Sequence, residues 1–388
     1  MPAQRLRDAL NDAARGLVER ESLLELIALA AVAREHVLVI GPPGTAKSEA
    51  VRRVARALGL GDKDGLGAQD GHYFEYLLGR FTEPSEIFGP VDLRRLREGV
   101  VETSTRGMLP EAEIAFLDEV FLGSSAILNT LLSILNERRF RRGHSVVDCP
   151  LRVAVGASNA LPDDDNLAAF ADRFLVRVFI EPVPDPMLEE LLTEGWRLER
   201  STDARTANVS DLDVLAEAAR NADLQGARPT LAEGIRLLRR AGVVLSDRRA
   251  VKVQRLVAAA AVLDGRQNAT GADVWPLVYA VPLGEQQTTA REVLRELLEE
   301  AASQALPAAA AEATLGARAR ASHLVSMGRQ MLADPPSAES PEHGAWRLQL
   351  ESLAREIDAG FSEDDRPTDL DEIRRSVVAI LGEAGTTS

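Results

Sequence analysis

Apolar side chains recur along the first half of the chain in two patterns, one with the period of helices and one of short, wholly apolar runs. Residues 1–35 follow the helical period, broken only at Gly16, and residues 36–40 form the first apolar run. The patterns that follow are, in chain order, a helix at 49–58, runs at 72–78 and 114–119, a helix at 124–136, a run at 151–157 and a run towards the end of 171–182. This alternation predicts an α/β fold of three layers, with helices on both faces of a parallel sheet of four or five strands.

The second half of the chain lacks strand-like runs. Helical patterns fill residues 187–283, and Ser246 or Asp247 is expected to cap the last of these helices. From about Glu285 the chain is helical and rich in Ala, Glu and Arg, with linker-like interruptions at 307–316 and 334–344. We therefore divide the chain into an α/β domain, a helical domain and a C-terminal helical region, at 1–185, 186–283 and 284–388.

The clearest chemistry lies in HVLVIGPPGTAKSEA, residues 36–50. A strand stops at Gly41, a loop rich in proline and glycine follows, and a helix begins near Lys47 and Ser48. This layout is typical of a phosphate-binding loop, in which backbone N–H groups and a helix N-terminus surround anionic oxygens. Lys47 would add a mobile charge, and Ser48 can bind Mg²⁺. Ala46 stands where the pattern usually has glycine, and we expect the loop to form because alanine is the smallest side chain that could replace it.

Two other strands end in polar side chains. The run at 114–119 ends in Asp118 and Glu119, which is the form of a Walker B motif. Such an aspartate can hold Mg²⁺ through water, and the glutamate can polarise an attacking water molecule. The run at 151–157 leads to Ser158 and Asn159. Because ligands of parallel α/β sheets lie beyond the carboxyl ends of the strands, we expect these side chains to meet the loop at one edge.

Charge and composition limit the kind of partner and the cellular location that we expect for the protein. The net charge of −15 counts against nucleic acid as the main partner. No apolar run approaches the roughly 18 residues that a membrane span needs, and the N-terminus lacks the apolar core of a signal peptide. The single cysteine, Cys149, excludes an internal disulfide and fits a reducing cytoplasm. A glycine-rich acidic segment, 59–71, is expected to be a surface loop.

Together these motifs resemble those of AAA+ ATPases and, within them, the MoxR family, with the RavA subfamily (regulatory ATPase variant) the most similar. The resemblance covers about residues 16–282 and rests on GPPGTAKS, FTEPSEIFGP, LPEAEIAFLDE, AILNTLLSILNERRFRRG, ASNALP, DRFLVR and LSDRR. It implies a P-loop AAA+ core with a five-stranded parallel sheet, followed by an all-α lid. RavA proteins carry a small β-domain among their C-terminal helices, whereas the tail here has a helical pattern.

The resemblance also implies cofactors and the residues that hold them. ATP would contact the loop and the turn before the first strand, through Gly41, Pro42, Pro43, Gly44, Thr45, Ala46, Lys47, Ser48, Glu49, Leu17 and Val18, the last two near the adenine. Ser48 and Asp118 would hold Mg²⁺, and Glu119 would activate water. Asn159 matches sensor 1, which positions that water against the γ-phosphate.

Two arginines would act on the nucleotide from outside the loop. Arg173, in DRF, matches an arginine finger that reaches a neighbouring subunit's nucleotide, and Arg177 and Arg138 are its rivals. Arg248, in SDRR, matches sensor 2, which contacts the γ-phosphate from the lid, and Arg249 is the rival there.

The implied function is Mg²⁺-dependent ATP hydrolysis by a homo-oligomeric ring, expected to be a hexamer, that remodels a protein client in a chaperone-like way with a von Willebrand factor A-domain partner. An insertion at about 91–108, patterned as a hairpin or a helix and ribbon, and a hairpin at about 140–148 would face the pore or the partner. Two other classes stay open: a nucleotide-gated scaffold with little turnover, and a nucleic-acid motor. The motor would need a basic pore, for which the insertion offers Arg94, Arg95, Arg97 and Arg106, without aromatic residues for stacking.

Overall fold

The central sheet has five parallel strands, as the apolar runs predict. The computed structural model describes residues 2–60, 72–99, 102–142, 145–198, 207–333, 335–336, 342–362 and 366–383. Most of the predicted surface loop at 59–71 lies outside these residues. The strands are β1 (Val37–Ile40), β2 (Tyr73–Leu77), β3 (Ile114–Asp118), β6 (Val153–Ser158) and β7 (Val176–Phe179), in the order β2-β3-β6-β1-β7. Their carboxyl ends therefore share one edge of the sheet.

Alternate residues of the central strands β1, β3 and β6 enter two separate cores, which explains why these strands are almost wholly apolar. Val37 and Val39 of β1 face one core, and Leu38 and Ile40 face the other. The first face is covered by α1 (Pro2–Ala14), α2 (Glu21–Ala33) and α3 (Lys47–Ala57). The second is covered by α4 (Pro84–Phe88), α6 (Ser125–Glu137) and α7 (Asp165–Ala171).

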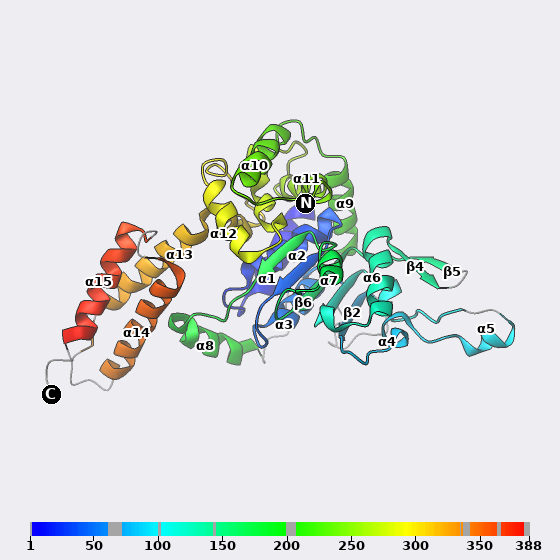
Figure 1. Ribbon diagram of the computed structural model, residues 1–388, viewed down its shortest axis with the longest axis horizontal. Coiled ribbons are helices and arrows are strands. Elements are labelled where there is room, and N and C mark those ends of the chain that lie inside the picture. Colours follow the sequence, from blue (N-terminus) through cyan, green and yellow to red (C-terminus); the bar gives the residue numbers. More distant parts are fainter. Residues whose placement is uncertain are drawn as a thin grey trace.

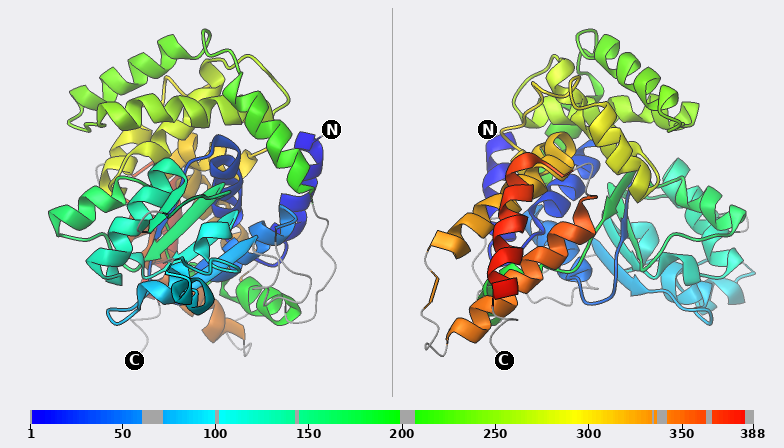
Figure 2. Two further views of the ribbon diagram at one scale, coloured as in Figure 1. Left: turned by 90° about the vertical axis from the view of Figure 1, so that its right-hand side faces the viewer. Right: turned by 60° about the vertical axis from the view of Figure 1, so that its left-hand side comes forward.

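Helix α2 lies at the centre of the molecule, and its side chains from Leu23 to Ala33 are all buried. It contacts α9 and α11 of the helical domain as well as α13 of the C-terminal region. The helical domain comprises α8 (Leu188–Leu198), α9 (Val209–Arg220), α10 (Arg228–Arg240), α11 (Asp247–Leu263) and the 3-10 segment η4 (Gly271–Ala280), and α12 (Gly284–Val293) follows directly after its predicted end. Figure 2 shows most of these helices, green to yellow, gathered on one side of the sheet.

The C-terminal region is formed by α13 (Pro307–Ala333), α14 (Glu342–Gly360) and α15 (Thr368–Glu383), at one end of the molecule in Figure 1. These helices share a small core of their own. The predicted linker at 307–316 is wrong, because this segment opens α13. Pro307 suits the first turn of a helix, alanine is the strongest helix former, and Glu25 of α2 accepts the N–H groups of Ala308 and Ala309 at 3.3 and 2.7 Å.

Two projections leave the α/β domain together, at the other end of the molecule (Figure 1). One carries α5 (Leu93–Arg97), framed by a bridge between Val91 and Thr103, and is the helix-and-ribbon form of the predicted insertion. The other is the predicted hairpin, β4 (Arg139–Arg142) and β5 (Ser145–Asp148). Where the two projections begin, the rings of Phe88 and Phe140 stack with their centroids 5.5 Å apart. Among the described helices, none has the length and apolar character needed to cross a membrane.

Candidate functional site: a phosphate-binding loop and its carboxylates

The loop between β1 and α3 has the backbone that the sequence pattern predicts. Gly41 leaves room for the chain that follows β7, because a Cβ there would lie 2.4 Å from the carbonyl oxygen of Ile180. Gly44 has φ +80°, a conformation that other residues rarely adopt. Ala46 is also left-handed, with φ 59° and ψ 24°, and α3 begins at the next residue. The loop thus forms with alanine at this position, at a backbone cost of about 1–2 kcal/mol.

Lys47 lies against its own loop. Its Nζ donates hydrogen bonds to the carbonyl oxygens of Gly41 (2.7 Å) and Pro42 (2.9 Å). Burial lowers the pKa of Lys47, and the nearby charges of Asp118 and Glu119 oppose that shift. The ammonium is therefore held between the loop and the carboxyl end of β3. A phosphate group in the loop would offer it stronger acceptors than the two carbonyl groups.

A buried arginine that the sequence analysis missed supports the loop from behind. Arg20 is 6% exposed, and its Nε donates to the carbonyl oxygen of Thr45 at 3.0 Å. One Nη donates to the carbonyl oxygen of Glu181, just after β7, at 2.9 Å. Arg20 thereby joins the loop to the start of α2. The same turn carries Leu17 and Val18, both buried, which places the expected adenine-contacting residues next to the loop.

The carboxylates and the amide of the predicted site meet where β3 and β6 end side by side. The amide Nδ2 of Asn159 donates to Oε1 of Glu119 at 2.6 Å. The backbone N–H of Glu119 donates to Oδ1 of Asp118 at 3.0 Å. Glu119 has φ 48° and ψ 46°, an uncommon conformation for a residue with a side chain. Such local strain clusters at functional sites, where it fixes the direction of a reactive group.

The residues expected to bind Mg²⁺ supply few ligands of their own. Ser48 and Asp118 are both half-buried at the loop and at the end of β3. Among the described residues there is no group of three or more His, Cys, Asp or Glu side chains that could hold a metal ion. This donor set fits a Mg²⁺ ion that takes most of its ligands from phosphates and water. Glu49, in contrast, points along α3, where its carboxylate pairs with Arg53 at 2.9 Å and Arg56 at 3.3 Å.

The predicted finger, Arg173, lies before β7 at the amino edge of the sheet, opposite the loop. Its Nε is buried and has no hydrogen-bond partner within the described part of the chain. Both rivals are held inside the subunit. Arg177 is 2% exposed and donates to the carbonyl oxygen of Ala171 at 2.5 Å, and burial lowers its pKa to about 9. Arg138 donates to the carbonyl oxygens of Arg34 and Leu135 at 2.9 and 3.0 Å.

The two arginines that begin α11 have different surroundings. Arg249 is 3% exposed and donates to the carbonyl oxygens of Ala280 and Leu175 at 2.8 and 2.6 Å. It also pairs with Asp172 at 3.1 Å, so it fastens the helical domain to the start of β7. Arg248 instead donates to the side-chain oxygen of Asn136, at the end of α6.

The position of Arg248 bears on its expected contact with the γ-phosphate. α11 lies along the amino edge of the sheet, since Lys252, one turn further on, pairs with Glu35 just before β1 at 2.6 Å. Lys47 lies beyond the carboxyl ends of the strands, at the opposite edge of the sheet. The structure therefore does not bring Arg248 together with Lys47 of the same chain. The remaining predicted residues of the loop, of β3 and of β6 do converge.

Comparison with known proteins identifies a family for two parts of the chain. Residues 4–217 match a family model described as the MoxR domain in MoxR-vWA-beta-propeller ternary systems, and residues 228–294 match an AAA lid domain. Two uncharacterized proteins of Methanocaldococcus jannaschii are each 34% identical to the chain, over 70% and 69% of it and over 69% and 66% of their own lengths. A candidate ATPase from Cytophaga hutchinsonii shares the fold, with a TM-score of 0.60 at 14% identity, over 78% of this chain and 96% of that one. The chain thus belongs to the MoxR family of AAA+ ATPases.

Proposed function

We propose that this chain hydrolyses ATP with the help of Mg²⁺. The observation that carries the proposal is the convergence of Lys47, Asp118, Glu119 and Asn159 at one edge of the sheet. Lys47 would leave the carbonyl groups of its loop and bind the β- and γ-phosphates. Ser48 and Asp118 would hold the metal ion, which draws charge from the phosphates.

Glu119 is the proposed group that orients and polarises the attacking water. Its carboxylate is held by the amide of Asn159 at 2.6 Å, so the amide fixes the direction of the base before substrate arrives. Asn159 would also donate towards the γ-phosphate as negative charge gathers there. Leu17 and Val18 supply a dry wall for the adenine, and Arg20 keeps the loop in place through Thr45.

We further propose that the site is completed by a neighbouring subunit in a ring, expected to be a hexamer. Arg173 and Arg248 both lie at the amino edge, away from the loop of their own chain. A copy of the chain that presents this edge to the next copy's loop would bring both cations to its γ-phosphate. Arg173 is partly exposed, whereas the rival Arg177 is 2% exposed, and this difference supports Arg173 as the finger.

A von Willebrand factor A-domain protein is the proposed partner, and chaperone-like remodelling of a protein client is the proposed task. The matched family model takes its name from systems that combine MoxR with vWA and beta-propeller proteins. A protein client is favoured over nucleic acid, because Arg95 in the insertion is already paired with Glu98 at 3.4 Å and Glu102 at 3.0 Å. A cytoplasmic location suits the single buried thiol of Cys149.

A place within the RavA subfamily stays a prediction. The motif FTEPSEIFGP, residues 81–90, forms part of the turn after β2 and helix α4, which is compatible with that subfamily. The described C-terminal residues form three helices, so a docking β-domain of the RavA type finds no counterpart among them.

The proposal is tested by measuring ATP binding and turnover in purified protein. We expect Lys47→Ala to lose ATP binding, and Glu119→Gln to bind ATP while its turnover falls by a factor of at least about a hundred. Equal hydrolysis by wild type and Glu119→Gln would remove the base from the mechanism. Normal ATP binding with negligible turnover in the wild type, even with its partner, would favour a nucleotide-gated scaffold.

A further inference from the structure

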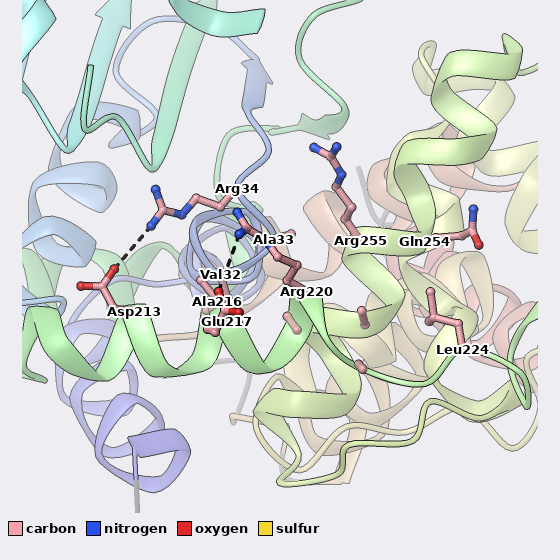
Figure 3. A pocket seen from close by; sticks show the side chains of 13 residues that line it. Val32, Ala33, Arg34, Asp213, Ala216, Glu217, Arg220, Leu224, Gln254 and Arg255 are labelled. Atoms are coloured by element: carbon pink, nitrogen blue, oxygen red, sulfur yellow. Dashed lines mark hydrogen bonds and ion pairs between the residues drawn. The ribbon is translucent and has the colours of Figure 1, made fainter. Parts of the chain in front are cut away.

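Two hollows adjoin at the amino edge of the sheet, on the side away from the phosphate-binding loop. One, of about 500 Å³, lies between the end of α2, α9 and α11 and has a floor of small side chains (Figure 3). The other, of about 490 Å³, lies between α6 and α11. They share Arg34, Arg220 and Arg255, so one ligand could occupy parts of both.

The second hollow concentrates positive charge in an acidic protein. Of the eight described residues that line it, six are cationic and none is acidic; the six are Arg34, Arg138, Arg220, Arg248, Lys252 and Arg255. The chain as a whole carries a net charge of −15. Clustered like charges destabilise a fold unless an opposite charge meets them, so such a cluster indicates a site for an anion.

Nearby carboxylates neutralise only part of this charge. Glu35 pairs with Lys252 at 2.6 Å and with Arg255 at 2.8 Å. Asp213 lies 3.4 Å from Arg34, and Glu217 lies 3.7 Å from Arg220; Figure 3 draws both as ion pairs.

For Arg138 and Arg248 the partners are neutral. Arg138 donates to carbonyl groups and contacts His36, which is kept neutral by burial. Arg248 donates to Asn136. Burial, with smaller effects of Arg34 and Arg255, lowers the pKa of Arg138 to about 10, although the charge of Glu35 opposes the shift.

We propose that the cationic hollow is a second phosphate site, which binds the polyphosphate group of a ligand. Guanidinium groups form paired hydrogen bonds with phosphate oxygens, and here they come from α9 and α11 and from the residues that follow α2 and α6. The neighbouring hollow offers Ala216, Ala219 and Ala258, whose small side chains leave room for a flat apolar group next to the phosphates. A nucleotide therefore fits the pair of hollows better than a bare anion does.

The phosphates could come from two sources, which one experiment with two arms distinguishes. The first arm titrates Lys47→Ala protein, whose loop is disabled, with inorganic tripolyphosphate and with ATP in EDTA, by calorimetry. This arm does not depend on the proposed ATPase. The second arm measures ATP-dependent self-association of protein with an intact loop by sedimentation, and it rests on the proposed ring. In each arm the protein is compared with the double variant Arg220→Gln/Arg255→Gln.

These two arginines are suitable for substitution because both are exposed. When Arg255 is replaced, Glu35 keeps its ion pair with Lys252. The matched control is Arg236→Gln/Arg240→Gln on α10, two exposed arginines that pair with Glu233 outside the hollows. Loss of affinity by about tenfold or more in the first arm assigns a free polyphosphate ligand. Loss confined to the second arm would show that the hollow contacts only the neighbouring subunit's nucleotide, and it overturns the second site. The proposal is overturned if neither arm changes, or if the control loses as much as the double variant.

Discussion

The adjacent arginines at the start of α11 allow a sharp test of how the helical domain is held. Replacing Arg249 by methionine keeps most of the side-chain stem but removes every donor. The carbonyl oxygens of Ala280, Phe174 and Leu175 then lose partners at 2.8, 3.2 and 2.6 Å. The carboxylate of Asp172 loses its cation at 3.1 Å.

The expected cost follows from these contacts. Each lost hydrogen bond is worth about 1 kcal/mol net, and the three carbonyl groups together give about 3 kcal/mol. Asp172 is 33% exposed, so water compensates much of its loss and adds at most about 1 kcal/mol. Burial lowers the pKa of Arg249, which means that removing its charge recovers some desolvation energy. We expect a destabilisation of about 3 kcal/mol overall.

Urea denaturation followed by tryptophan fluorescence measures this, because Trp275 is fully buried in η4, the segment that ends at Ala280. Arg248→Met is the control: one hydrogen bond at a half-exposed site predicts a change of less than about 1 kcal/mol. The reasoning is refuted if Arg249→Met is as stable as wild type, or if the two variants are equally destabilised.

Three further outcomes are expected. Burial raises the pKa of Glu25 to about 7, so its contribution to stability is complete below about pH 4 and is lost as the pH rises through about 7. The melting temperature of the wild type should therefore fall between those pH values, and Glu25→Gln should flatten that fall. An unchanged fall in the variant would contradict the prediction. Asn159→Ala should lower kcat by roughly ten- to a hundredfold with ATP affinity nearly unchanged, because it loses the orientation of Glu119 and a donor that acts as charge gathers on the γ-phosphate. Steady-state kinetics and calorimetry measure the two quantities, and an equal fall in affinity would argue against this. Ala46→Gly should leave the melting temperature within about 3 °C, since relief of left-handed strain offsets the entropy of glycine; a large shift would mean the strain was misjudged.

The strands and the carboxyl edge could be predicted from sequence because their signals are local. β1, β3 and β6 are continuous apolar runs, and in a parallel sheet their ends must meet, which brings Asp118 and Asn159 to the loop. The hairpin at about 140–148 was likewise predicted, and β4 and β5 form it.

The features that were missed depend on contacts between distant segments. Arg20 has no distinctive neighbours in sequence, and only folding brings it to Thr45 and Glu181. The segment after Pro307 has the composition of a linker, but a carboxylate from α2 caps its first turn. Arg248 lies at the amino edge because α11 packs against α2, a long-range contact that no local pattern indicates.

The central claim, an ATPase site completed by a second copy, is tested most directly by mixing two inactive variants. Lys47→Ala disables the loop, and Arg173→Ala removes the finger, so each alone should hydrolyse ATP poorly. In a mixture, the loop of an Arg173→Ala subunit can meet the finger of a Lys47→Ala subunit. We predict that mixing restores a substantial part of wild-type turnover per active loop. Turnover in the mixture no higher than the sum of the separate variants, or full activity of Arg173→Ala alone, would contradict the account.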